Sequence, residues 1–145
     1  MKLLKNTGTD RVVDELRQCL DSQGALDMAT PALSLFAFGE LHDLLARLAR
    51  CRLVLPSGLG GYLALLGAES DRSFRNRLQA RWLAKQCAAW LEAKVEVKSA
   101  PGMVPQSTLS VGSAESGLKR VITGTCSFTT AGLGITPSTE LSLIP

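Results

Sequence analysis

Residues 121–144 read VITGTCSFTTAGLGITPSTELSLI, and the fold of the chain is decided here more than anywhere else. The apolar and β-branched residues at the start predict a strand, and Gly124-Thr-Cys-Ser-Phe-Thr129 predicts a tight turn. A glycine-rich loop follows, and the stretch closes with a second short strand that ends at Ile144. The pattern predicts two strands connected through a compact turn and loop.

Strand and helix signals alternate in the chain before this stretch. Apolar residues that recur every three or four positions predict helices over residues 11–20, 35–50 and 73–94. Shorter apolar or alternating segments predict strands over residues 25–29, 51–55, 95–98, 108–111 and 120–123. This order predicts an α/β fold, in which residues 1–145 form a single domain with one mixed β-sheet flanked by helices.

The composition is typical of one globular domain with a genuine core, since 46% of the 145 residues are apolar. The net charge of +3 is only mildly basic. The four cysteines are widely spaced and the chain has one histidine, so we expect no metal site and no cofactor. The start of the chain lacks a signal-peptide pattern, and no apolar run is long enough to span a bilayer. We therefore expect a cytoplasmic protein without a membrane partner.

Four segments carry a resemblance to a known family. They are Asp10-Arg-Val-Val-Asp-Glu-Leu16, Leu35-Phe-Ala-Phe-Gly-Glu-Leu41, Arg75-Asn-Arg-Leu-Gln-Ala-Arg-Trp-Leu-Ala-Lys85 and the turn and loop that begin at Gly124. In this order they resemble the phospholipase D-like domain at the N-terminus of certain bacterial Swi/Snf- or DEAD-type helicases, which are often linked to restriction or phage defence. The resemblance covers nearly the whole chain and implies the α/β fold predicted above.

The catalytic motif of that family is degenerate in this sequence. The resemblance implies a His-x-Lys motif whose histidine attacks phosphorus, and a turn asparagine that binds phosphate oxygens together with the lysine. Here Gln106 stands at the histidine position, Thr108 at the lysine position and Ser127 at the asparagine position, while Thr125 replaces the usual serine. We therefore expect no catalytic residues. The turn amides near Gly124, Thr125 and Ser127 form a hypothetical phosphate pocket.

A run of cations lies in the first part of the third predicted helix. Arg75, Arg77, Arg81 and Lys85 are the candidate nucleic-acid-binding residues, and the last three are four positions apart on one side of the helix. Two interpretations are open: a solvated helix face with nothing bound, or a surface that contacts phosphates without reading sequence. Trp82 lies near the basic side, whereas Trp90 is expected in the core.

The only histidine, His42, lies inside the second predicted helix, far along the chain from the motif strand. We expect it to be a surface or half-buried side chain. The leading prediction is a non-catalytic phospholipase D-like module that serves a DNA-processing or defence helicase through nucleic-acid or protein contacts. Its expected partners are DNA, a helicase subunit or domain beyond this chain, and a second copy of itself. Two alternatives stay open: an active phosphodiesterase or nuclease with displaced or partner-supplied residues, and a homodimeric assembly module without DNA binding.

Overall fold

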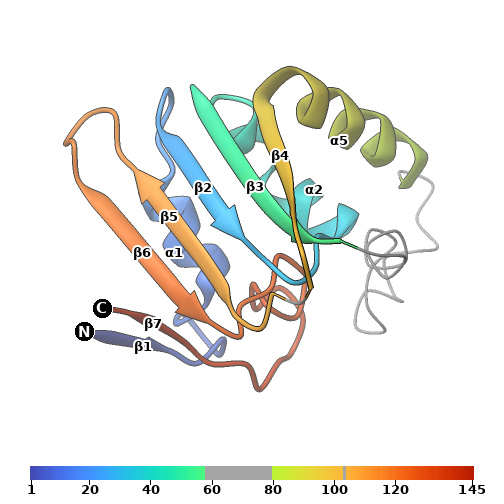
Figure 1. Cartoon of the computed structure of the whole chain (residues 1–145). Helices are drawn as coiled ribbons and strands as arrows, with labels where there is room; N and C mark the ends of the chain where they lie inside the picture. The colour runs from blue at the N-terminus through green and yellow to red at the C-terminus, as the bar shows by residue number, and fades with distance from the viewer. Residues whose placement is uncertain (58–79, 103) are drawn as a thin grey trace.

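Ten helices and strands are resolved in a computed structural model that describes residues 1–57, 80–102 and 104–145 (Figure 1). They follow one another as β1 (Lys2–Leu4), α1 (Val12–Cys19), β2 (Ala25–Ala29), α2 (Leu35–Leu45), β3 (Arg50–Pro56), α5 (Ala80–Lys94), β4 (Val95–Ala100), β5 (Ser107–Gly112), β6 (Lys119–Gly124) and β7 (Ser142–Ile144). The α/β class and the mixed sheet expected from the sequence are confirmed.

The strands form one sheet in the order β1-β7-β6-β5-β2-β3-β4. The β2–β3 and β3–β4 pairs are parallel, and the other pairs are antiparallel. At one edge the two ends of the chain pair with each other, with Lys2 opposite Ile144 (Figure 1). Strand β1 was not predicted from the sequence. Strand β4 forms the other edge.

The first two helices begin where polar side chains satisfy their free backbone amides. The side chain of Asn6 accepts a hydrogen bond of 3.0 Å from the amide of Val12 at the start of α1. The hydroxyl of Ser34 accepts one of 3.2 Å from the amide of Phe36 and so caps α2. In this way both helices are anchored by a residue that precedes them.

Helix α2 is shorter than predicted, because it ends at Leu45 instead of Arg50. The amide of Gln23 donates to the carbonyl of Arg47, and the amide of Ala49 donates to the carbonyl of Gly24, both at 2.9 Å. These backbone bonds to the segment before β2 replace helical bonds, so the helix ends before residue 47. Arg50, which we expected in the last turn of the helix, therefore lies in β3.

The third predicted helix is confirmed from Ala80 to Lys94, and its expected beginning at residues 73–79 lies outside the described residues. Its inward side buries Trp90, as predicted, together with Cys87. It also packs closely on α2, since a Cβ atom placed on Gly39 would lie only 3.0 Å from the side chain of Leu83. The small residue at position 39 lets the two helices approach each other.

The described helices contribute to a single apolar core on one face of the sheet. Its sheet side is formed by alternate strand residues that include Leu26, Leu53, Leu109 and Ile122, each at most 1% exposed. The strand residues between them point to the opposite face, which is polar and accessible. Within the described part of the chain, no helix has the length and apolar character needed to cross a membrane.

Candidate functional site

The fold brings the predicted motif strand beside the predicted turn. Strand β5 pairs with β6 so that Ser107 lies opposite Gly124 and Thr108 opposite Thr123. The hydroxyls of Thr108 and Thr123 are 3.4 Å apart on the accessible face of the sheet. Gln106 is exposed immediately before β5. The positions that the resemblance aligns with histidine and lysine thus adjoin the end of β6, where the turn begins.

The turn after β6 is held tightly against the strand that closes the sheet. Gly124 has a φ of +147°, and a Cβ atom there would lie 2.5 Å from the carbonyl oxygen of Leu141, so only glycine fits. The amide of Thr125 donates to that same carbonyl at 3.1 Å, and the Thr125 hydroxyl accepts from the Leu141 amide at 3.1 Å. Thr125 therefore fastens the turn to the segment that leads into β7.

The amides of the hypothetical phosphate pocket have internal acceptors. The amide of Ser127 donates to the carbonyl of Thr125 at 2.8 Å, and the amide of Thr125 donates to Leu141. The Ser127 hydroxyl lies 3.1 Å from that of Thr129. A phosphate at Gly124, Thr125 and Ser127 would have to compete with these bonds for the two amides.

A buried group of hydroxyls lies behind the motif strand, and sequence reasoning missed its central residue, Thr30. The Thr30 hydroxyl donates to the carbonyl of Ala32 at 2.8 Å and accepts from the amide of Phe128 at 3.0 Å. It also accepts from the hydroxyl of Ser107 at 3.3 Å. Thr30 is fully buried and Ser107 is 1% exposed. This network joins the end of β2, the start of β5 and the turn, and its only sequence signal is the position of Thr30 directly after a strand.

His42 is half-buried on α2, as expected, and lies away from the motif. Its side chain is 25% exposed, with Nδ1 at 3.3 Å from a carboxylate oxygen of Asp43. The ring stands edge-on to those of Phe38 and Trp82, at centroid distances of 5.4 and 5.6 Å. The contact between α2 and the turn is made at Ser34, whose amide donates to the carbonyl of Phe128. His42 follows about 12 Å further along the helix axis.

The cysteines are poor nucleophiles and poor ligands in this fold. Burial raises the pKa of Cys51 to about 12, with a further contribution from the charge of Asp27, and burial raises that of Cys87 to about 11. Burial also raises the pKa of Cys126 and of the half-buried Cys19. Among the described residues, no group of three or more histidine, cysteine or acidic side chains is arranged to hold a metal ion.

Two of the four candidate nucleic-acid-binding residues fall in the described part of α5. Arg81 and Lys85 are exposed and lie one helical turn apart. Trp82 is 51% exposed beside them and edge-on to His42, so it is a half-exposed packing residue. We call Arg81, Trp82 and Lys85 the α5 basic surface. Arg75 and Arg77 lie outside the described residues.

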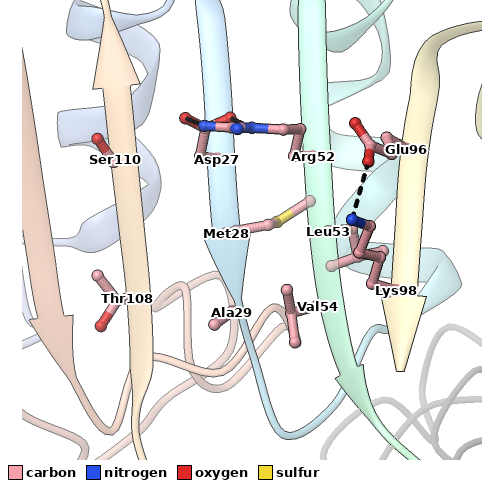
Figure 2. A pocket seen from close by; sticks show the side chains of 10 residues that line it. All are labelled: Asp27, Met28, Ala29, Arg52, Leu53, Val54, Glu96, Lys98, Thr108 and Ser110. Carbon is pink, nitrogen blue, oxygen red and sulfur yellow. Dashed lines mark hydrogen bonds and ion pairs between the residues drawn. The ribbon is translucent and has the colours of Figure 1, made fainter. Parts of the chain in front are cut away.

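The accessible face of the sheet carries a charged group that was not predicted. Asp27 of β2 accepts two hydrogen bonds from the guanidinium of Arg52, at 2.7 and 2.8 Å, and one from Arg50 at 3.0 Å (Figure 2 shows the Arg52 pair). The hydrogen bonds from Arg52, together with the charges of both arginines, hold the pKa of Asp27 below its usual value. Lys98 and Glu96 pair at 3.5 Å on neighbouring β4. Of these side chains, Asp27, Arg52, Glu96 and Lys98 border a hollow of about 360 Å³ over β2, β3, β4 and β5.

No protein-family model matches the chain, and a search among curated proteins finds no match. The resemblance to the phospholipase D-like domain therefore remains a hypothesis carried by the segments and motif positions named above.

Proposed function

We propose that the chain is a non-catalytic phospholipase D-like module that serves a DNA-processing or defence helicase, and that it contacts nucleic acid through the α5 basic surface. The proposal that the module is non-catalytic rests on the chemistry of the residues at the motif positions. Gln106, Thr108 and Ser127 offer an amide and two hydroxyls where the family reaction needs an imidazole, an ammonium and an asparagine. None of the three is a nucleophile paired with a base.

The surroundings of the motif support the loss of that reaction. The hydroxyl of Thr108 pairs with that of Thr123, and the hydroxyl of Ser127 pairs with that of Thr129. The buried hydroxyls of Thr30 and Ser107 bond to each other. These groups stabilise the junction of strands and turn, which is a structural role.

The α5 basic surface supports the nucleic-acid half of the proposal. Arg81 and Lys85 present two exposed cations on one side of α5, and exposed cations contribute to sequence-independent affinity for phosphates. Trp82 beside them is 51% exposed, and an exposed aromatic side chain can stack on an unpaired base. A cytoplasmic setting belongs to the same proposal, and the free state of all four thiols is consistent with it.

Fluorescence anisotropy with labelled single- and double-stranded DNA at low and high salt tests the proposal. We expect salt-sensitive binding that is lost in Arg81→Glu/Lys85→Glu. The matched control Lys5→Glu/Lys119→Glu changes the net charge equally at two exposed positions elsewhere, and should keep most of the affinity. Equal loss in both variants, or no binding by the wild type, would contradict the proposed surface.

The same samples, examined on a gel, test the non-catalytic part. We expect the DNA to stay intact. Cleavage that persists through stringent purification would instead favour the alternative of a phosphodiesterase or nuclease with displaced residues.

A further inference from the structure

Strand β4 is a sheet edge whose side chains are open to solvent. Its one partner among the described strands is β3. Four consecutive residues in its middle are exposed, and Val97 is 47% exposed although it points to the helix-bearing face. An exposed edge strand with an apolar side chain is a template for pairing with another strand.

The backbone of β4 has a defined outward side. The carbonyl of Ala100 accepts from the amide of Ser57 at 3.0 Å, so Ala100 directs its backbone groups toward β3. Because these directions alternate along a strand, Val95, Val97 and Ser99 direct their amides and carbonyls away from the sheet. An additional strand at this edge would bond to these three residues.

We propose that two copies of this chain pair antiparallel through β4, with Val97 opposite Val97 of the second copy. In this register Val95 lies opposite Ser99 of the second copy, so every outward backbone group of the three residues finds a partner. The arrangement yields roughly six backbone hydrogen bonds across the two-fold axis.

The charge pattern of β4 favours this register. On the accessible face, Glu96 lies opposite Lys98 of the second copy, and Lys98 opposite Glu96 of the second copy. These are the closely spaced, non-hydrogen-bonded pairs of an antiparallel ladder, where side chains interact most strongly. One neighbouring register would place Glu96 opposite Glu96 of the second copy, and the other would place Lys98 opposite Lys98 of the second copy. Like charges directly opposite each other are destabilising.

The opposite face gains an apolar contact at the same time. The two Val97 side chains meet on the helix-bearing side and cover each other. The pairing joins two seven-stranded sheets into one and leaves both α5 helices on the same side of it. This inference holds whether or not the chain binds DNA, so it can fail or succeed independently of the proposed function.

A charge-exchange experiment tests the pairing. Sedimentation equilibrium over a dilution series should show a wild-type dimer that dissociates on dilution, and a wild type that stays monomeric at its highest soluble concentration would overturn the proposal. Glu96→Lys and Lys98→Glu should each weaken self-association on the order of tenfold.

A mixture of the two variants places lysine opposite glutamate at every pair, and should restore the dimer. Lys119→Glu, an equal charge change on β6, should dimerise like the wild type.

Cross-linking tests the register independently. Val97→Cys should form a disulfide-linked dimer under mild oxidation, because the two-fold axis puts the paired Cα atoms about 5.5 Å apart. Ser99→Cys is the matched control on the same exposed strand, and should not cross-link to itself because it lies opposite Val95 of the second copy. A dimer that cross-links equally through both positions, or one unaffected by either charge variant, would exclude this interface.

Discussion

Asn6 and Gly132, which lie 126 positions apart in the chain, are joined by a hydrogen bond of 3.0 Å from the side-chain amide to the carbonyl oxygen. The other end of the same side chain accepts from the amide of Val12 at the start of α1. Asn6 is 4% exposed and has a φ of +55°, a conformation that asparagine tolerates better than most residues. One side chain therefore positions both the first helix and the glycine-rich loop.

Replacing Asn6 with alanine removes both bonds and leaves a strained backbone. We expect Asn6→Ala to lower the free energy of unfolding by about 2–3 kcal/mol, measured by urea denaturation. Asn6→Gly loses the same bonds without the strain, so it should be about 1 kcal/mol more stable than Asn6→Ala. An alanine variant as stable as the wild type would show that the two bonds contribute nothing.

Thr30 should be far more important to stability than the exposed Thr108. Thr30→Val keeps the shape of the side chain but leaves the buried amide of Phe128 and hydroxyl of Ser107 without their acceptor. We expect Thr30→Val to lower the free energy of unfolding, measured by thermal denaturation, by about 2 kcal/mol. Thr108→Val, whose hydroxyl is exposed, should change stability by less than about 0.5 kcal/mol. Equal effects of the two substitutions would contradict the buried network.

Glu15 should make the protein sensitive to acid. Its carboxylate is 5% exposed and pairs with Lys2 at 2.9 Å and with Arg120. Burial alone would raise the pKa of Glu15, but the hydrogen bond from Lys2 and the charges of Lys2 and Arg120 outweigh it and hold the pKa below its usual value. The stability that this supplies is fully present above the ordinary pKa and is lost as the pH falls through the lowered one.

Glu15→Gln should therefore cost about 1–3 kcal/mol at neutral pH, and less as the pH falls below about 4. Thermal unfolding across this range measures both effects. Asp14→Asn, one residue away in a more exposed pair with Arg11, is the control and should cost less than about 1 kcal/mol. A Glu15→Gln deficit that stays constant with pH would rule out this linkage.

Glu140 is expected to behave in the opposite way. Its Oε2 atom is buried without a hydrogen-bond partner, and burial raises the pKa of this carboxyl group. The folded state therefore disfavours the ionised form, and this destabilisation is present above the ordinary pKa and relieved as the pH falls. Glu140→Gln should raise the melting temperature by a few degrees at pH 7, with a gain that shrinks toward pH 4. A lower melting temperature at pH 7 would contradict this account.

The sequence predicted the parts of the fold that depend on local periodicity. Helix α1, the helix over Leu35–Leu45 and the burial of Trp90 follow from apolar spacing of three to four positions, because that spacing places the apolar residues on one helix face. Strand β1 escaped prediction because three residues show no periodicity, and its partner β7 lies at the other end of the chain. The end of α2 was placed too late because the bonds that stop it come from residues 23 and 24.

The site was predictable only where it lies within one stretch of sequence. The adjacency of Thr108 and the turn at Gly124 follows from two strands joined by a short connection. Thr30 gave no signal beyond its position after a predicted strand, and Asn6 gave none, because a buried hydrogen bond depends on partners brought together by the whole fold. Asp27 and Arg52 each stand between apolar residues of a predicted strand, so the sequence places each on the polar side of its own strand. Only the parallel pairing of β2 with β3 makes them neighbours.

The pairing of β1 with β7 makes the two edges of the sheet different, because one edge holds both termini and the other holds β4. Both termini emerge side by side at one margin of the sheet, while β4 occupies the opposite margin (Figure 1). A tether or affinity tag attached at either terminus is thus carried away from β4. The same geometry suits circular permutation, because a short linker between Met1 and Pro145 would bridge neighbouring strands and allow new ends to be opened elsewhere.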